Sequence, residues 1–258
     1  MKSHLSRRRF LAGLLSGVGT VAVAGCDRLV QNGEVNAWLR NTERLTMGSQ
    51  RLLLGRQSLA REYGEADLSP VFRANGTQTP DSEEYSRLLE SDFVDWRLQV
   101  DGLVRHPLSL SLADLKRFSS RTQITRHDCV EGWSAIGKWQ GVSLGRVLDV
   151  AGLKPGARYV VFYCADELER TLDGSGRYYE SIDLLDAYHP QTILAYGMNG
   201  KDLPVAHGAP LRLRVERQLG YKQAKYLMRV EVVAAFDHLW GGQGGYWEDR
   251  GYEWYAGI

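Results

Sequence analysis

Apolar and polar positions from residue 95 onward predict a series of short strands. Over residues 95–100 polar side chains alternate with apolar ones, and a turn at Asp101-Gly102 follows, which is typical of a half-buried strand. A continuous apolar run over residues 159–164 predicts a buried strand. Further strands are predicted over residues 193–196, 211–215 and 228–233. The last two segments alternate strictly, so each of these strands should turn one side towards water or a ligand.

Short helices are predicted between these strands. Ser111, with Asp114 three residues later, is typical of a helix N-cap, and this helix should run to Phe118. A second short helix is predicted over residues 143–150 and a helical turn over residues 182–188. Short helices scattered among strands of mixed spacing favour an α+β fold over a doubly wound parallel sheet.

The first 26 residues have the features of an export signal. Residues 7–9 are three arginines that resemble the twin-arginine consensus, and the uncharged stretch over residues 10–25 is 16 residues long. That is short for a membrane-spanning helix, which needs about 20 residues. The stretch ends either in a signal-peptidase site at residues 22–24 or in a lipobox-like sequence, in which Cys26 would be acylated. The alternative interpretation is a basic start before a buried core helix.

We therefore expect twin-arginine export to the periplasm or another extracytoplasmic location, with a lipid anchor at Cys26 if the lipobox is used. The twin-arginine route carries folded proteins, which hints at a cofactor that is loaded before export. Residues 27–64 are polar with helical spacing in places, and they predict one or two surface helices and a linker. Over residues 64–91 no period holds, and an irregular segment of this length is usually functional or disordered.

Composition and charge exclude several classes of protein. The chain has 258 residues, of which 43% are hydrophobic and 24% charged, so it is globular and suits one large domain or two small ones. Three cysteines are too few for a disulfide scaffold. Residues 26–258 carry 28 basic and 31 acidic side chains, a net charge of −3, whereas a nucleic-acid-binding protein normally needs a basic excess.

Common enzyme motifs are missing from the sequence. It contains no G-x-G-x-x-G after a strand, no Walker A sequence and no G-x-S-x-G elbow. Its six histidines never occur at zinc-ligand spacing, and there is no C-x-x-C. Nothing singles out a pair of carboxylates for hydrolysis.

Three segments carry candidate chemistry. Cys129 follows Arg126 and His127 at the end of a predicted strand, and these neighbours should lower the pKa of its thiol and favour a metal ligand or nucleophile. The alternative is a small buried cysteine. His207 and Arg212 form a second cluster, and the glycine-rich residues 219–225 add Lys222 and Lys225. Such groups suit a phosphate, although each segment alone is more often a solvated turn.

Taken in order, these segments resemble the sulfite oxidase family of molybdenum-cofactor enzymes. The match runs over residues 71–233 and is closest to the single-domain bacterial branch typified by the periplasmic methionine-sulfoxide reductase catalytic subunit. A cysteine followed by Val-Glu-x-Trp, with G-A-P-x-R-L about eighty residues later, is a specific combination. The resemblance rests on residues 126–134, 189–194, 208–213 and 220–225.

The resemblance implies an α+β molybdopterin-binding fold of mixed, barrel-like sheets with short helices over residues 65–258. It also implies a molybdenum–molybdopterin cofactor with Cys129 as the metal's protein ligand, a soft thiolate. Cys164 and His207 depart from the methionine-sulfoxide reductase branch, which has a threonine and an asparagine there. The positions implied to hold the cofactor are Phe72, Arg73, Asn75, Cys129, Cys164, His207, Arg212, Lys222, Gln223, Ala224 and Lys225.

The implied activity is an oxidoreductase that moves an oxygen atom to or from a small sulfite-like or sulfoxide-like substrate. Arg126 and Arg73 are candidates for drawing the polar oxygen to the metal, and their alternative role is pairing with acids such as Asp128. The sequence has no haem-attachment C-x-x-C-H, so we expect a separate membrane haem protein or soluble cytochrome as electron partner. We expect a monomer, since the chain ends 25 residues after Val233, without room for the family's dimerising domain.

Three alternatives stay open. One is a cofactor-free lipoprotein that binds a ligand or partner with the family pocket. Another is a thiol enzyme that uses Cys129 directly as a nucleophile. The third is structural: Cys129 and Cys164 could form a disulfide in an oxidising compartment. Glu131 and Trp133 are interpreted as supports of the cysteine loop and not as catalytic groups, and the aromatic residues 246–255 should pack on the core or form a partner surface.

Overall fold

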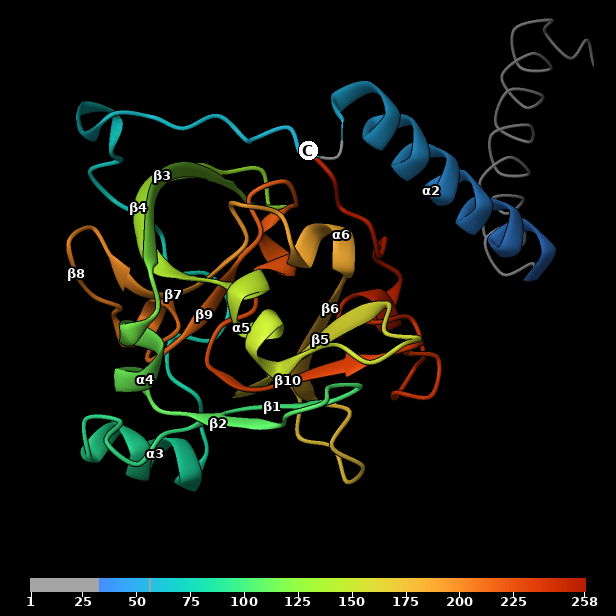
Figure 1. Ribbon diagram of the computed structural model, residues 1–258. Helices are drawn as coiled ribbons and strands as arrows, with labels where there is room; N and C mark the ends of the chain where they lie inside the picture. The colour runs from blue at the N-terminus through green and yellow to red at the C-terminus, as the bar shows by residue number, and fades with distance from the viewer. Residues whose placement is uncertain (1–32, 56) are drawn as a thin grey trace, which may run out of the picture. The chain divides into compact units, whose positions relative to one another are not determined.

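The computed structural model describes residues 33–55 and 57–258 (Figure 1). The described residues belong to two units, the first of which ends at Leu53 and the second of which runs from Leu54 to Ile258. The predicted export signal and Cys26 lie outside the described residues, so their assignment stays a prediction. Within the described ranges, no helix is both long and apolar enough to span a bilayer.

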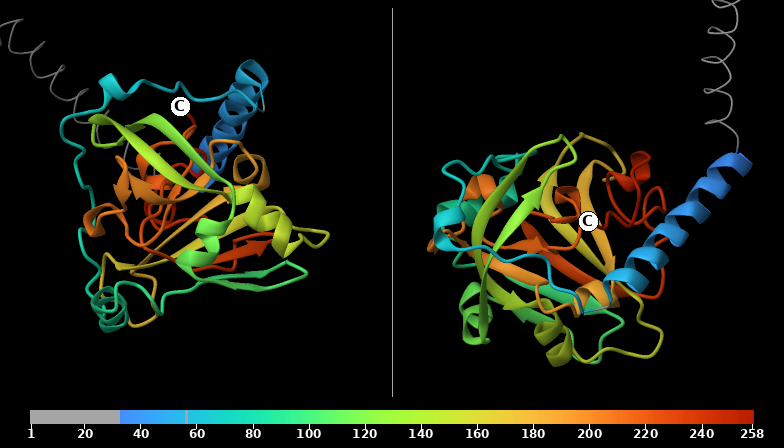
Figure 2. Two further views of the ribbon diagram at one scale, coloured as in Figure 1. Left: turned by 60° about the vertical axis from the view of Figure 1, so that its left-hand side comes forward. Right: turned by 90° about the horizontal axis from the view of Figure 1, so that it is seen from above.

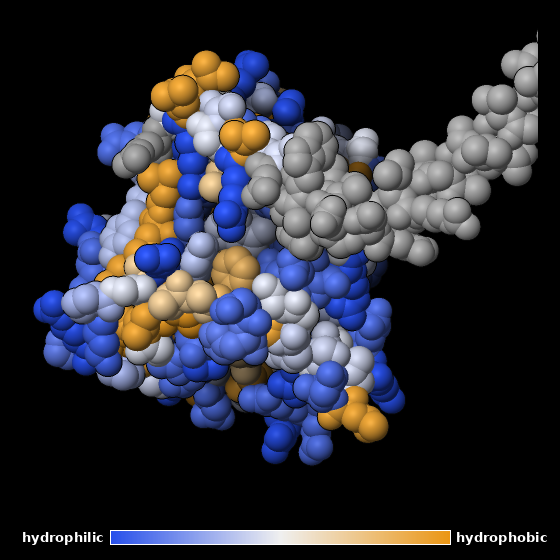
Figure 3. Space-filling view, turned by 90° about the vertical axis from the view of Figure 1, so that its right-hand side faces the viewer, coloured by the Kyte–Doolittle hydropathy of each residue, from blue (hydrophilic) through white to orange (hydrophobic). Residues whose placement is uncertain are grey.

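In the first unit, α2 (Gly33–Leu54) confirms the helix expected within residues 27–64. Its side chains Leu45, Leu52 and Leu53 are 70%, 83% and 83% exposed. Large apolar side chains therefore lie on the surface of this helix. In Figure 3 apolar residues, in orange, likewise occur as patches among hydrophilic ones on the face that is drawn.

The second unit contains two sheets and several short helices, which confirms the expected α+β class. One sheet has both parallel and antiparallel pairs, and the other is antiparallel. The first sheet has the strand order β2-β1-β10-β5-β6, in which β1 runs parallel to β10 and every other pair is antiparallel. Its strands are β1 (Leu98–Gly102), β2 (Leu108–Leu110), β5 (Tyr159–Glu167), β6 (Arg177–Asp183) and β10 (Leu227–Val233). Because β5 lies between β10 and β6 with Val160, Val161 and Phe162 fully buried, its sequence is a continuous apolar run.

The second sheet has the order β3-β4-β7-β8, with β9 paired to β7. Its strands are β3 (Ser120–Asp128), β4 (Ser134–Ser143), β7 (Ile193–Met198), β8 (Lys201–Asp202) and β9 (Arg212–Arg214). Strands β3 and β4 form a long curved hairpin (Figure 2) whose register pairs Asp128 with Ser134, so residues 129–133 are its loop. The geometry of this hairpin places Cys129 at the tip.

Two predicted helices form where expected. Helix α4 (Leu112–Arg117) is capped at Ser111 by the reciprocal bonds with Asp114 that the sequence indicated. Helix α5 (Leu144–Ala151) buries Leu144, Val147, Leu148 and Ala151 against the core, with a spacing typical of one helix face. Helix α6 (Leu184–Ala187) is the predicted turn.

The structure corrects one expectation about local structure and narrows another. Residues 64–91 are not entirely irregular, because they contain a 3-10 turn (Glu65–Asp67) and helix α3 (Glu83–Glu90), which is capped by Ser82. Strand β9 turns its basic side inward and not to water, because Arg212 and Arg214 are both buried, and Arg212 lines the cavity described below, which is the ligand-facing case of the expectation. The alternation of apolar and basic residues there reflects buried cations and not solvent.

Residues 60–69 run along the β3–β4 hairpin, as the cyan segment in Figure 1 shows. The backbone N–H of Tyr63 donates to Ile124 (2.9 Å), and that of Ser69 donates to Ile136 (3.0 Å). The side chain of Gln191 bonds both the N–H and the carbonyl of Ala60. These contacts attach residues 60–69 to the second unit.

A buried ion cluster fixes the C-terminal residues to the first sheet. The ammonium of Lys222 lies between the carboxylates of Glu180 on β6 and Glu248, and all three side chains are fully buried. Its cation also lies 5.5 Å from the centre of the Trp254 ring. Burial raises the pKa of Glu180, and the neighbouring Glu248 raises it further while Lys222 lowers it.

Replacing Lys222 by Met should lower the free energy of unfolding by about 3–5 kcal/mol, because two buried carboxylates lose their counter-charge. The deficit should grow with pH, because loss of the cation raises the pKa of Glu180 further and ionisation of a buried acid then opposes folding. In strong acid, where this carboxyl is protonated in the folded and unfolded states, the deficit should shrink. Denaturant titrations at several pH values measure this.

The matched control is Lys116→Met, which removes an exposed ion pair with Asp202. This change should cost less than about 1 kcal/mol at any pH. Equal losses in the two variants would show that the buried cluster does not hold the C-terminal residues.

Candidate active site

A cavity of about 420 Å³ opens in the second unit around the tip of the β3–β4 hairpin. Six chain segments contribute to its lining, although they are far apart in the sequence. Besides residue 178 on β6, they are residues 72–77, 127–133, 166–169, 206–212, 220–225 and 246–252. The cavity therefore exists only once both sheets and the C-terminal residues are in place.

Cys129 is the thiol in this cavity and is 8% exposed. Its N–H donates to the carbonyl of Trp133 (2.9 Å), and Gly132 closes the loop with a left-handed φ of +84°. The side-chain amide of Asn75 donates to Sγ at 3.3 Å. The residues of the hairpin loop thus hold the sulfur towards the cavity.

The pKa of the Cys129 thiol is raised, contrary to the sequence-based expectation. Burial is the dominant cause, while the amide of Asn75 and the charge of Arg73 oppose it. The neighbours that were expected to lower this pKa do not supply a positive charge to the sulfur. Arg126 pairs with Asp128 at 2.9 Å, and burial keeps the pKa of His127 well below its usual value.

Eight of the residues predicted to form the site line this cavity together. They come from the segment before α3, the hairpin loop, the stretch before β9 and the loop after it. They are Phe72, Arg73, Asn75, Cys129, His207, Arg212, Gln223 and Lys225.

Four predicted site residues are not among the lining residues. Arg126, expected to draw substrate, is half exposed and pairs with Asp128, which was its alternative role. Cys164 is buried within β5 opposite Leu227, and both Cys129 and Cys164 are free thiols, so the disulfide alternative is wrong. Lys222 points into the carboxylate cluster described above. Ala224 is buried, and its carbonyl accepts from Leu213.

Phe72 is the aromatic centre of the cavity floor. Its ring centre lies 5.3 Å from Trp139, 5.6 Å from His127 and 5.6 Å from His207. These three partners come from β4, β3 and the turn before β9. Packing against them explains how residues 72–77, which form no strand or helix, are held against the cavity.

Lys225 secures the same segment. Its ammonium donates to the carbonyls of Asn75 (2.8 Å), Ala206 (3.1 Å) and Thr77. An ammonium has three N–H bonds, so these three carbonyls use all of them. Burial, together with Arg212, lowers the pKa of Lys225 to about 8. Lys225 therefore lines the cavity, but its three N–H groups all bind backbone carbonyls. Its side chain was expected to bind a phosphate.

Arg212 is the cation with a free donor. Its two terminal nitrogens donate to the carbonyls of His207 (2.9 Å) and Gln223 (3.1 Å), whereas its Nε has no hydrogen-bond partner among the described residues. Burial lowers the pKa of Arg212 to about 9, with Arg214 as the next cause. Burial also lowers the pKa of His207 to about 4, so this imidazole is neutral.

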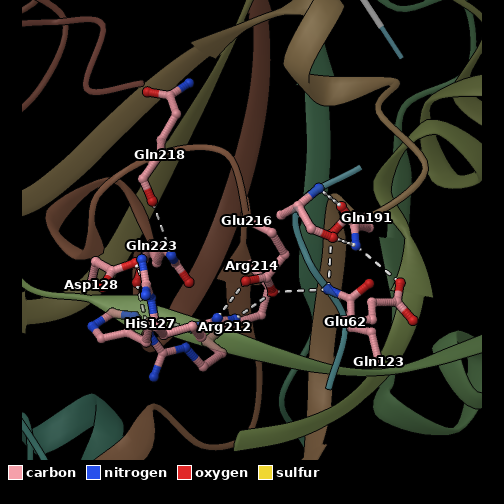
Figure 4. A network of polar contacts seen from close by, with 12 residues as sticks. Glu62, Gln123, His127, Asp128, Gln191, Arg212, Arg214, Glu216, Gln218 and Gln223 are labelled. Carbon is pink, nitrogen blue, oxygen red and sulfur yellow. Dashed lines mark hydrogen bonds and ion pairs between the residues drawn. The ribbon is translucent and has the colours of Figure 1, made fainter. Parts of the chain in front are cut away.

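A polar network lies behind the cavity (Figure 4). Arg214 forms a bidentate ion pair with Glu216, in which Nε donates to Oε1 at 2.9 Å and a terminal nitrogen donates to Oε2 at 2.6 Å. Both side chains are fully buried. Another Arg214 nitrogen lies 3.1 Å from Nδ1 of His127. A guanidinium can only donate, so Nδ1 accepts and the neutral ring carries its proton on Nε2.

The network continues away from the cavity through two glutamines. Gln123 donates to Glu216 (2.8 Å) and to the carbonyl of Gln191 (3.0 Å). Gln191 in turn donates to Glu62 at 2.9 Å. The segment around Glu62 and strand β3, which leads to Cys129, are thus joined by buried and partly buried hydrogen bonds.

The sequence analysis missed several lining residues. Asp166 is 4% exposed, its Oδ1 has no hydrogen-bond partner in the described part of the chain, and burial raises its pKa to about 6. Asp166 follows the apolar run that predicted strand β5, and nothing in the sequence indicated that its side chain reaches the cavity. His127 was treated only as a neighbour of Cys129. The aromatic residues 246–252 were noticed, but their place in a cavity depends on tertiary packing.

The donor set fits the cofactor that the sequence resemblance implied. Cys129 offers a soft thiolate ligand once deprotonated by a metal. Arg212 Nε is a buried donor and Asp166 Oδ1 a buried acceptor without partners in the described residues, and both belong to the lining. The free donor suits an anionic group of a ligand, and the free acceptor suits a ligand N–H or O–H group. Among residues 33–55 and 57–258, no cluster of three or more His, Cys, Asp or Glu side chains forms a separate metal site.

Comparison with known proteins agrees with this arrangement. The chain is 36% identical over 252 residues to the putative protein-methionine-sulfoxide reductase subunit YedZ1 of Azospira oryzae, covering 98% of this chain and 88% of that protein. It is 32% identical over 241 residues to the protein-methionine-sulfoxide reductase catalytic subunit MsrP of Xanthomonas axonopodis pv. citri, covering 88% and 70%.

A solved structure, the sulfane dehydrogenase SoxCD from Paracoccus pantotrophus, aligns with a TM-score of 0.48 at 25% identity. The alignment covers 54% of this chain and 38% of that one, and it adds no independent argument at this score. Residues 86–239 match the family model of the oxidoreductase molybdopterin-binding domain, which confirms the cofactor expected from the sequence. Because this domain takes up more than half of the chain, the protein belongs to the molybdopterin-binding oxidoreductases.

Proposed function

We propose that this oxidoreductase reduces the sulfoxide of methionine to the thioether in an extracytoplasmic compartment. In this reaction the sulfur–oxygen bond breaks, the sulfur gains two electrons, and the oxygen leaves as water with two protons. The observation that carries the proposal is the thiol of Cys129, which lines the same cavity as Arg212, a buried arginine whose Nε has no hydrogen-bond partner among the described residues. The names of the two relatives support the choice of substrate.

The residues of the cavity would divide the work as follows. Cys129 would bind molybdenum, and Arg212 would hold an anionic part of the molybdopterin. When bound, this cofactor supplies the two-electron redox chemistry. Arg73 lines the same cavity with its guanidinium 5.7 Å from the Trp133 ring centre, and it would attract the negative oxygen of the sulfoxide.

Electrons would come from a separate haem protein or cytochrome. The relatives are named as a subunit and a catalytic subunit, which supports a partner of this kind. We further propose export by the twin-arginine route and a lipid anchor at Cys26, on the basis of residues 7–26. A lipid anchor would raise the effective concentration of a membrane-bound electron donor.

The thiol-enzyme alternative is less consistent with the site. A nucleophilic cysteine needs a lowered pKa, whereas burial raises that of Cys129. The cofactor-free binding module is distinguished by metal analysis. Protein from a molybdate-fed host that contains neither molybdenum nor pterin fluorescence would support that alternative.

Replacing Cys129 by Ser should abolish bound molybdenum or reduce it to a few per cent, because a hydroxyl is a poor soft-metal ligand. The unfolding midpoint of the metal-free form should stay near that of metal-free wild type. Metal analysis and circular dichroism measure both quantities. Full turnover by this variant would disprove the ligand assignment.

Arg73 and Arg126 offer a matched pair of variants, because the structure places only Arg73 in the cavity. Arg73→Ala should lower kcat/KM for methionine sulfoxide by about 10²-fold, a typical loss for one preorganised charge. Arg126→Ala should change it by less than about twofold, since exposed ion pairs contribute little. The reverse order of effects would place substrate beside Arg126.

The proposed reaction is tested with metal-verified protein, reduced viologen as electron donor, and a panel of methionine sulfoxide, dimethyl sulfoxide and trimethylamine N-oxide. Sulfite is assayed separately with an artificial electron acceptor. We expect methionine sulfoxide to give the highest kcat/KM. Sulfite oxidation alone would overturn the proposed direction.

A further inference from the structure

We propose that five aromatic side chains of the cavity form an aromatic wall, Tyr178, Tyr221, Tyr246, Trp247 and Tyr252, that binds the alkyl part of the substrate and selects methionine sulfoxide within a polypeptide over small sulfoxides. This inference rests on the proposed function, and it assigns specificity to residues outside the cationic part of the cavity. All five side chains belong to the cavity lining.

The wall is continuous. The ring centres of Tyr178 and Tyr246 are 5.7 Å apart, and those of Tyr246 and Trp247 are 5.2 Å apart. Tyr252 lies 5.3 Å from Trp247 and 5.2 Å from Tyr221. Each of these separations is typical of paired aromatic rings. The members come from β6, from the loop after β9 and from the C-terminal residues.

The exposure of the side chains changes along the wall. Tyr178 and Tyr246 are 9% and 2% exposed, whereas Tyr252 is 38% exposed. Trp247 is intermediate. The aromatic surface therefore extends from the buried part of the cavity to its mouth.

Hydrogen bonds and charges hold the wall rigid. Tyr178 donates to the carbonyl of Tyr221, and Tyr221 donates to that of Glu253 at 2.7 Å. Arg250 binds Glu169 at 2.8 Å and the carbonyl of Tyr246 at 3.0 Å, and its guanidinium lies 3.6 Å from the Tyr246 ring centre. A wall that is rigid before binding loses little entropy when a ligand arrives.

The chemistry of a sulfoxide matches this division of the lining. Its oxygen is a strong hydrogen-bond acceptor and suits the cation Arg73. Its methyl and methylene groups are apolar and gain free energy on contact with aromatic rings, as sulfur does. Dimethyl sulfoxide ends at its two methyl groups, whereas a methionine sulfoxide within a peptide continues outward. Only the longer substrate can contact the exposed end of the wall.

The experiment compares Trp247→Ala and Tyr252→Ala with wild type, as holoenzymes with reduced viologen as donor. The substrates are a short peptide with a central methionine sulfoxide and dimethyl sulfoxide. We expect KM for the peptide to rise roughly five- to tenfold with kcat within about twofold, in line with the loss of one aromatic contact. The kcat/KM for dimethyl sulfoxide should change by less than about twofold.

Trp240→Ala is the matched control. Trp240 belongs to the same C-terminal residues and is 39% exposed, but its ring packs on Tyr179 at 4.3 Å and is not part of the lining. Its loss should leave KM for the peptide unchanged. An unchanged peptide KM in both wall variants, or an equal loss for both substrates, would overturn the inference.

A binding measurement separates this inference from the proposed function. Calorimetry on the oxidised holoenzyme without a donor measures peptide binding in the absence of turnover. Weaker binding by Trp247→Ala supports the wall even if wild type reduces no sulfoxide, in which case the proposed function alone fails. Equal affinity of the variant and wild type overturns the wall whatever the activity.

Discussion

The burial of two arginines on one short strand is the constraint on which the site depends. Arg214 has a carboxylate partner in Glu216, so its charge is balanced inside the protein. Among the described residues, Arg212 contacts two backbone carbonyls and the face of Trp139, 4.9 Å from its guanidinium, and it forms no ion pair. Burying a cation without a counter-ion is unfavourable, and its lowered pKa reflects that cost. An anionic ligand in the cavity would supply the missing charge, as a phosphorylated pterin does.

The rest of the cavity is built around this unbalanced charge. Phe72 packs among aromatic and imidazole rings, and Lys225 holds residues 75–77 through two of their carbonyls and binds the carbonyl of Ala206 as well. His127 is kept neutral by burial and by the neighbouring arginines, so it adds no further positive charge. The cations thus have distinct tasks: one binds ligand, one balances an acid, and one fixes the chain.

The cavity joins two surfaces of different character. The thiol, Arg73 and Arg212 make one part suited to charge, and the wall that ends at Tyr252 makes another suited to alkyl groups. The buried cluster of Lys222, Glu180 and Glu248 stabilises the C-terminal residues that carry most of the wall. If the wall selects substrate as proposed, stability of the fold and selectivity would depend on the same short segment.

Much of the local structure followed from the sequence, because its causes are local. The Ser111 cap, the helix before Gly152 and the buried run in β5 each depend on neighbouring residues alone. The motif around Cys129 likewise indicated the cofactor and its ligand. The partners of Lys222, Lys225 and Arg126 could not be chosen from the sequence, because a cation's partner is set by what packs against it. In the structure Lys222 binds Glu180, Lys225 binds the carbonyl of Thr77, and Arg126 binds Asp128.

The sequence by itself determined the fold class, the family and the thiol, since these depend on periodicity and on a motif whose residues are adjacent in the chain. Only the tertiary structure decided which groups reach the cavity, that the Cys129 thiol has a raised pKa, and that Asp166 and Tyr252 belong to the lining. The physical reason is that charge, burial and desolvation are properties of a three-dimensional environment. That environment forms when segments from residue 72 to residue 252 pack together.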